Sequence, residues 1–221
     1  MTSQTLETTI YSLSEDTPRP TARPERRGGE RHMTLYRVGS ITIGDRRELC
    51  LIKNISAGGM MIRAYSSLSA GAAVEIELKS GQPIGGIVNW VRDENAGVTF
   101  DAPIDVIDIL SVSMDGPRPR MPRIEVDCMA TLREGANILR LKVCDISQGG
   151  VKLECSSTLP IDADAVVTLP GIQAHAGSIR WCSDGHVGIT FNRLLPLVDL
   201  VQWLRQQRES ATPDPAINRP G

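Results

Sequence analysis

The sequence is poor in aromatic residues, which make up 4% of its 221 residues. No apolar run approaches the roughly 18 residues that a membrane-spanning helix needs. The first residues also lack the apolar core of a signal peptide. The formal net charge is −2, so the chain lacks the basic excess that is typical of nucleic-acid-binding proteins. We therefore expect a cytoplasmic protein that neither inserts into a membrane nor binds DNA or RNA.

Residue patterns typical of catalysis and of metal binding are also missing. The five cysteines form no CxxC pair, and no cysteine stands at ligand spacing from any of the three histidines. Several cysteines fall within alternating apolar segments, where a buried free thiol is the expected role. The sequence shows no paired acid and base and no nucleophile motif. We therefore expect no enzymatic activity, no metal site and no cofactor.

What the sequence does contain is a repeat of itself at a constant offset of 91 residues. A period of this length exceeds the roughly 20–50 residues of solenoid repeats and fits a duplicated domain of about 100 residues. Features that both copies keep are best interpreted as structural, and features that one copy lacks as functional. The matched pairs are NISAGG at 54–59 with DISQGG at 145–150, Trp90 with Trp181, Gly97 with Gly188, and Phe100 with Phe191.

Proline-rich and polar stretches separate the two copies and flank them. The first residues and the last ones hold few large apolar groups, so we expect both tails to be disordered. The segment DGPRPRMP at 115–122 has the composition of a linker. The predicted organisation is a tail at 1–22, a first domain at 23–114, a linker at 115–122, a second domain at 123–208 and a tail at 209–221.

Each copy contains six alternating apolar segments of strand length, followed by apolar residues at helical spacing. The helical segments start with proline, which suits a first helical turn. The pattern predicts a mainly β protein with two tandem six-stranded antiparallel barrels, each followed by a C-terminal helix that covers an open end. The predicted strands are 34–43, 47–54, 59–65, 73–79, 84–91 and 96–100, then 124–132, 138–146, 150–155, 164–169, 173–182 and 186–191; the predicted helices are 103–114 and 196–209.

Two elements of the first copy together favour an anionic ligand with a purine edge. The stretch RPERRGGERH at 23–32 presents arginines whose planar, forked guanidinium groups can pair with phosphate or guanine. The later corner between strands offers an amide, a hydroxyl and two glycines that permit positive φ and close approach of a base. Taken singly, an arginine stretch is also typical of a solvated face, and a Gly-Gly corner of a hairpin. The candidate binding residues are Arg26, Arg27, Arg31, Asn54, Ser56, Gly58 and Gly59.

The order of these elements resembles the PilZ domain family. That family has RxxxR, then [DN]xSxxG, then GxVxW-like and GxxF strands, then a C-terminal helix. Here these appear as Arg27–Arg31, as Asn54, Ser56 and Gly59, as Gly86-Ile87-Val88-Asn89-Trp90 and as Gly97-Val98-Thr99-Phe100. The resemblance implies a six-stranded barrel that binds the bacterial second messenger cyclic di-GMP, and a protein effector that the sequence does not identify. It also implies that the RxxxR arginines, helped by Arg26, hold the ligand against the corner.

The second copy keeps the corner but departs from the arginine motif. Arg118 matches Arg27, whereas Pro122 stands where the first copy has Arg31. Losing one bidentate guanidinium contact costs about 1–3 kcal/mol, so we predict a weak or non-binding second domain. A shift of the loop by a residue would let another arginine substitute. The residues of this possible weak second site are Arg118, Arg120, Arg123, Asp145, Ser147 and Gly150.

Two other functions remain open at this stage. Some domains that resemble this family lack the arginines and act as ligand-independent interaction adaptors. Small barrels also bind single strands through aromatic platforms and a basic groove, which the charge of −2 disfavours. We interpret Trp90 and Trp181 as core packing residues rather than as ligand-stacking ones.

Overall fold

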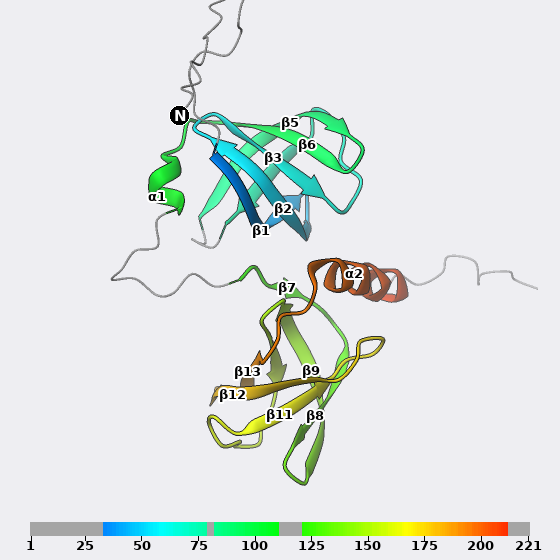
Figure 1. Ribbon diagram of the computed structural model, residues 1–221. Coiled ribbons are helices and arrows are strands. Elements are labelled where there is room, and N and C mark those ends of the chain that lie inside the picture. The colour runs from blue at the N-terminus through cyan, green and yellow to red at the C-terminus, as the bar shows by residue number, and fades with distance from the viewer. Residues whose placement is uncertain (1–32, 79–81, 111–120, 212–221) are drawn as a thin grey trace, which may run out of the picture. The chain divides into compact units, whose positions relative to one another are not determined.

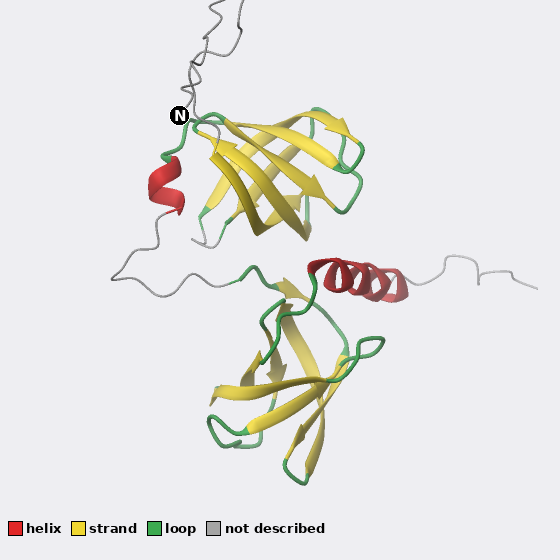
Figure 2. Cartoon of the chain, viewed as in Figure 1, coloured by secondary structure: helices red, strands yellow, loops and turns green. Residues whose placement is uncertain are grey.

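The computed structural model describes residues 33–78, 82–110 and 121–211. This part of the chain is mainly β, with two antiparallel barrels and two helices (Figures 1 and 2). The prediction of two tandem six-stranded barrels is confirmed. The predicted tail at 1–22, residues 212–221 of the predicted tail at 209–221 and most of the predicted linker lie outside the described residues. Residues 209–211 are helical, so the second tail begins later than predicted.

The first barrel closes on itself through the pairing of its first and fourth strands. Ser40, Ile41 and Thr42 of the first strand pair with Glu77, Ile76 and Glu75 of the fourth. The order of hydrogen-bonded neighbours is β1-β2-β3-β6-β5-β4. Closure leaves no unpaired sheet edge among the strands described for this barrel. The strands are β1 (Met33–Ile43), β2 (Arg46–Ser56), β3 (Gly59–Ala64), β4 (Ala73–Glu77), β5 (Pro83–Arg92) and β6 (Asn95–Phe100).

The second barrel has the same topology, but its first strand is divided. The sequence predicted one strand over 124–132, whereas the structure has two short strands separated by residues 126–128. Between the paired positions Glu125–Asp145 and Met129–Lys142 the first side has one residue more than its partner, which is a β-bulge. The strands are β7 (Ile124–Glu125), β8 (Met129–Glu134), β9 (Asn137–Ser147), β10 (Gly150–Glu154), β11 (Asp164–Thr168), β12 (His175–Ser183) and β13 (His186–Phe191).

The offset of 91 residues holds in the irregular parts of the barrels as well as in the strands. The β5–β6 pairing has a bulge before Trp90, and the β12–β13 pairing has one before Trp181. The hairpin turns that follow contain Asp93 and Asp184, with positive φ values of 54° and 52°. The duplication therefore preserves local backbone geometry.

The cores form where the alternating apolar residues point inward. In the first barrel the fully buried side chains include Ile52, Ile62, Ile76 and Val88. Burying each such side chain stabilises the fold by about 1.5–3 kcal/mol. The second barrel places Val143, Leu153, Val167 and Ile179 at the equivalent positions, and all four are buried.

Helix α1 (Val106–Leu110) is shorter than predicted and lies beside the first barrel (Figure 1). The sequence predicted a helix over 103–114 with its proline in the first turn, but the helix begins after Asp105. The Asp105 Oδ1 accepts hydrogen bonds from the Ile107 and Asp108 N–H groups at 2.9 and 3.1 Å, so Asp105 is the N-cap. Residues 111–114 of the predicted helix lie outside the described residues.

Helix α2 (Leu197–Ala211) agrees closely with the predicted segment 196–209. Its Trp203 is buried and donates a hydrogen bond from Nε1 to the Pro170 carbonyl oxygen at 2.6 Å, which fixes the helix to the loop after β11. Neither helix in the described part of the chain is long and apolar enough to cross a membrane.

Candidate functional site

The predicted corner is a tight hairpin between β2 and β3. Ser56 and Gly59 are paired across the two strands, and Ala57 and Gly58 form the turn. The Ser56 hydroxyl donates to the Gly59 carbonyl oxygen at 3.1 Å, and Ser56 is only 6% exposed. The sequence predicted a free hydroxyl here. The structure instead uses this hydroxyl to close the hairpin.

The glycines of the corner permit close strand packing. We predicted that they permit positive φ, but neither Gly58 nor Gly59 is among the described residues with positive φ. A Cβ on Gly59 would lie 2.5 Å from the Val98 carbonyl oxygen on β6, far inside contact distance. A Cβ on Gly150 would likewise lie 2.2 Å from the Ile189 carbonyl oxygen. Both copies therefore keep this glycine for a structural reason.

Asn54 is the corner residue whose side chain has a hydrogen-bond donor that the fold does not use. Its side-chain oxygen accepts a hydrogen bond from the Met61 N–H at 3.1 Å. Among the described residues, its side-chain nitrogen donates to no partner. Asn54 is half-buried and lies opposite Thr34 of β1, so this amide nitrogen is available to a ligand beside the start of β1.

A row of paired residues crosses the outer face of the first barrel from Asn54 to Trp90. Trp90 is 41% exposed, and its indole covers Gly97, where a Cβ would lie 2.1 Å from the indole nitrogen. Trp90 is thus a packing residue, as predicted, but it lies on the outer face and not in the core. The same holds for Trp181, which is 37% exposed. Sequence reasoning missed this row, because register decides which residues become neighbours. In order, the row is Thr34, Asn54, Met61, Gly97 and Trp90.

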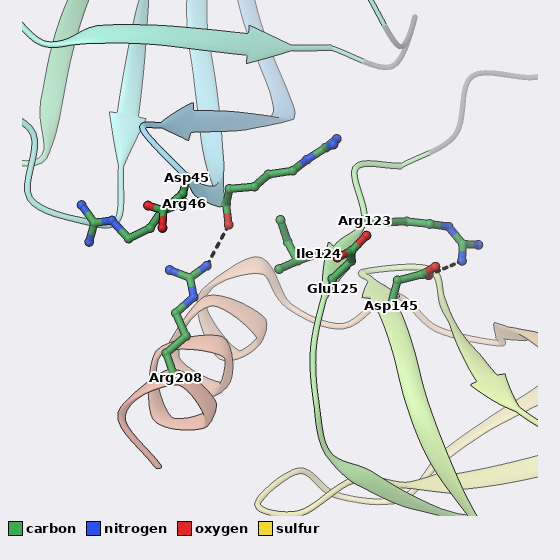
Figure 3. Close-up of a pocket in the computed structure, with 8 residues that line it drawn as sticks. Asp45, Arg46, Arg123, Ile124, Glu125, Asp145 and Arg208 are labelled. Atoms are coloured by element: carbon green, nitrogen blue, oxygen red, sulfur yellow. Dashed lines mark hydrogen bonds and ion pairs between the residues drawn. The ribbon is translucent and has the colours of Figure 1, made fainter. Parts of the chain in front are cut away.

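The second corner has the same backbone but a different side-chain partner. Ser147 donates to the Gly150 carbonyl oxygen at 3.4 Å, as Ser56 does to Gly59. Asp145, however, accepts a hydrogen bond from Arg123 Nη1 at 2.5 Å (Figure 3). Of the arginines predicted for this site, Arg123 is therefore brought to the corner. Arg118 and Arg120 lie outside the described residues, as do Arg26, Arg27 and Arg31 of the first site.

The strand register shows that Arg123 does not replace Arg31. Ile124 pairs with Ile146 just as Met33 pairs with Ile55, at the constant offset of 91. Arg123 therefore corresponds to position 32, and the strand has not slipped.

The second corner also carries charges that the first corner lacks. Glu125 lies directly opposite Asp145, where the first barrel has Thr34 opposite Asn54. Two like charges facing each other across strands are unfavourable, and Arg123 offsets this repulsion. A phosphate that approached this corner would meet two carboxylates.

All five cysteines are free, and burial changes the acidity of three of them. Burial raises the pKa of the Cys50 thiol to about 12, and burial also raises the pKa of Cys128 and of Cys144. Since the thiolate is the nucleophile and the metal ligand, these raised pKa values make the three thiols less reactive than an ordinary cysteine. Within residues 33–78, 82–110 and 121–211, no group of three or more His, Cys, Asp or Glu residues is arranged to hold a metal ion.

The fold and its corners define a tandem of small closed β-barrels, each with a buried serine-closed hairpin next to the start of its first strand. The model of the PilZ domain family matches residues 25–112 and 117–206. The chain therefore belongs to the PilZ domain family, with two copies of the domain.

Solved structures with limited similarity to this chain include three that are described as complexes with c-di-GMP. The PlzA protein of Borreliella burgdorferi in complex with c-di-GMP is 13% identical, with a TM-score of 0.35, over 79% of this chain and 92% of that one. YcgR of Escherichia coli in complex with c-di-GMP is 14% identical, with a TM-score of 0.32, over 79% and 86%. The MrkH–c-di-GMP complex of K. pneumonia is 13% identical, with a TM-score of 0.32, over 79% and 89%. No curated protein sequence matches this chain significantly.

Proposed function

We propose that this protein is a non-catalytic receptor for cyclic di-GMP and that the ligand binds to the first domain. The ligand contacts are Arg26, Arg27 and Arg31 on one side and the corner from Asn54 to Gly59 on the other. The proposal is supported by membership of the PilZ domain family and by the relatives whose structures contain this ligand. Its main support within the molecule is the pairing of Met33 with Ile55.

That pairing limits how far the arginines lie from the corner. Arg31 is two residues before Met33, and an extended chain advances at most about 3.6 Å per residue. The Cα atom of Arg31 therefore lies within about 7 Å of the Cα atom of Met33, which is paired directly with Ile55. In our proposal, the guanidinium group of Arg31 and the amide nitrogen of Asn54 both donate hydrogen bonds to a ligand that lies between them.

The second domain, in our proposal, binds cyclic di-GMP weakly or not at all. It lacks the arginine at position 122, and its corner carboxylate is already paired with Arg123. The missing guanidinium contact costs about 1–3 kcal/mol, and breaking a partly exposed ion pair costs up to about 1 kcal/mol. Together these terms weaken binding by roughly 5- to 1,000-fold relative to the first domain.

Ligand binding then changes what the protein presents to an effector. Two phosphates and the guanine edges draw Arg27 and Arg31 onto the corner, which alters contacts between the domains or with a partner protein. The ordering of the arginine segment opposes binding, so an affinity in the micromolar range is expected.

Calorimetry of the whole chain with cyclic di-GMP, and separately with GTP and cyclic di-AMP, tests the proposal. We expect binding of cyclic di-GMP alone, with one intercalated ligand dimer per chain. Equal heats for all three nucleotides would contradict the proposal. Micromolar binding to an isolated 115–210 fragment would contradict the part of the proposal that concerns the second domain.

Three arginine variants locate the site. Arg31→Ala should abolish binding and leave the ligand-free thermal melt unchanged. Arg31→Lys should also bind poorly, because an ammonium group keeps the charge but loses the bidentate fork. Arg92→Ala is the matched control: this exposed arginine lies at the end of β5 farthest from the corner, so binding should be unaffected.

A ligand-independent adaptor is the second candidate function, and the self-paired corner of the second domain favours it for that domain. Capture of the same partner with and without cyclic di-GMP would support it. Because MrkH is described as a c-di-GMP-dependent transcription regulatory factor, the expected lack of nucleic-acid binding stays a prediction. Binding to oligonucleotides that falls steeply with salt would contradict it.

A further inference from the structure

Each corner is hydrogen-bonded to the segment that leads into the C-terminal helix of its domain. In the first domain, the Ile104 N–H donates to the Ala57 carbonyl oxygen at 2.9 Å, and the Phe100 N–H donates to that of Gly58 at 3.0 Å. The two turn residues of the candidate site therefore hold the backbone that enters helix α1.

The second domain repeats both bonds at the equivalent positions. The Leu195 N–H donates to the Gln148 carbonyl oxygen at 2.8 Å, and the Phe191 N–H donates to that of Gly149 at 2.9 Å. The connection between corner and helix is therefore a feature of the domain rather than of one copy.

One side chain makes the connection stronger in the second domain. The Gln148 side-chain nitrogen donates to the Leu195 carbonyl oxygen at 2.9 Å, so Gln148 binds the backbone of Leu195 at both its N–H and its C=O. The first domain has Ala57 at this position, which has no side-chain donor. Leu195 is 1% exposed, whereas its counterpart Ile104 is half-buried.

The C-terminal helix is also packed more firmly in the second domain than in the first. Helix α2 has fully buried residues such as Leu200, and Trp203 anchors it to Pro170. Helix α1 has five residues, none of which is buried. Helix α1 packs on the core of the first barrel only through partly buried residues. Movement of the corner therefore meets less resistance from α1 than from α2.

We propose that the bond from Ile104 to Ala57 is the output link of the first domain, and that Gln148 locks the equivalent link in the second. This inference rests on the proposed function, because it takes cyclic di-GMP as the ligand of the first corner. A ligand held against Asn54 and the turn reorients the peptide groups of Ala57 and Gly58. Because hydrogen bonds weaken steeply as their angles depart from linearity, the backbone at Ile104 responds, and helix α1 is released or shifted.

Hydrogen exchange of the full chain, measured by mass spectrometry, tests both the output link and the Gln148 lock. With saturating cyclic di-GMP, exchange of residues 104–110 should change, and exchange of residues 195–200 should not. Binding that is seen by calorimetry without any change at 104–110 would overturn the output link. A change of equal size at 195–200 would overturn the lock.

Two variants test the link without ligand. Gln148→Ala should speed exchange at Leu195 about fivefold, because one typical hydrogen bond contributes about 1 kcal/mol. Gln148→Met keeps the length of the side chain but not the donor, so it should have the same effect. Ala57→Gln should slow exchange at Ile104 by a similar factor. The control is Gln173→Ala, an exposed glutamine of the same domain, which should leave exchange at Leu195 unchanged.

These outcomes separate the two proposals. If calorimetry detects no cyclic di-GMP binding, the proposed function fails, while the ligand-free exchange still measures the Gln148 lock. Unchanged exchange at Leu195 in both Gln148 variants would overturn the lock whatever the ligand does.

Discussion

Arg123 donates a hydrogen bond to Asp145 at 2.5 Å, whereas the equivalent Asn54 accepts one from the backbone of Met61. One corner is thus closed by a side chain of its own domain, and the other keeps an amide nitrogen available. This relationship, rather than any difference in the hairpin backbone, distinguishes the two domains.

The ion pair itself should contribute little to stability. Both side chains are partly exposed, at 36% for Arg123 and 20% for Asp145, and such pairs are worth up to about 1 kcal/mol. Arg123→Ala should therefore lower the free energy of unfolding by at most about that amount at low salt. Urea unfolding measures this, and a loss above about 3 kcal/mol would mean that the pair is a structural element of the barrel.

Restoring the missing arginine should create a second ligand site. Pro122→Arg rebuilds the RxxxR spacing with Arg118, and Asp145→Asn makes the corner like that of the first domain. We expect the double variant to raise the calorimetric stoichiometry from one to two ligand dimers per chain. Because Pro122 is buried, circular dichroism should first confirm that the variant is folded. A folded double variant with unchanged stoichiometry would show that other residues silence the domain.

Gly150 should be intolerant of substitution, whereas its neighbour Gly149 should not. A Cβ on Gly150 would lie 2.2 Å from the backbone oxygen of Ile189, while one on Gly149 would lie 3.1 Å from the flexible Met121 sulfur. Gly150→Ala should cost about 1–3 kcal/mol or more by forcing strands apart. Thermal melts of the two single variants compare them directly, and equal melting temperatures would refute the close-packing role.

The buried Cys50 thiol should make stability fall at high pH. Burial raises its pKa from 9.0 to about 12, so the stabilisation is complete below pH 9 and is lost as the pH rises from 9 through 12. Between pH 7 and pH 10 the loss is about 1 kcal/mol. Urea unfolding at both pH values should show this decrease in the wild type beyond that of Cys50→Ala, in which this contribution is missing. An equal decrease in the free energy of unfolding in both proteins would show that the Cys50 thiol is not its cause.

Most of the fold could be predicted from the sequence because it depends on local periodicity. Alternating apolar residues located each strand to within a few residues, and the constant offset identified the second barrel from the first. The exceptions are local conflicts. The strand predicted over 124–132 is interrupted at residues 126–128, although the equivalent bulge in β1 leaves that strand continuous. The capping oxygen of Asp105 starts helix α1 after the proline rather than with it.

The site was predicted less completely, because side-chain roles depend on partners far away in sequence. Ser56 was predicted to have a free hydroxyl, yet the hydroxyl is used within the hairpin. Trp90 was predicted to lie in the core, yet it covers Gly97 on the outer face, in one row with Asn54. No linear pattern shows which faces of four strands become adjacent.

The sequence by itself determined the duplication, the two barrels and the loss of the arginine at position 122, since each follows from residue identity and spacing along the chain. Only the tertiary structure decided that the second corner is occupied by Arg123 and that Gln148 ties that corner to the helix behind it. Those contacts join residues 22 and 47 positions apart, and strand register and barrel closure bring them together.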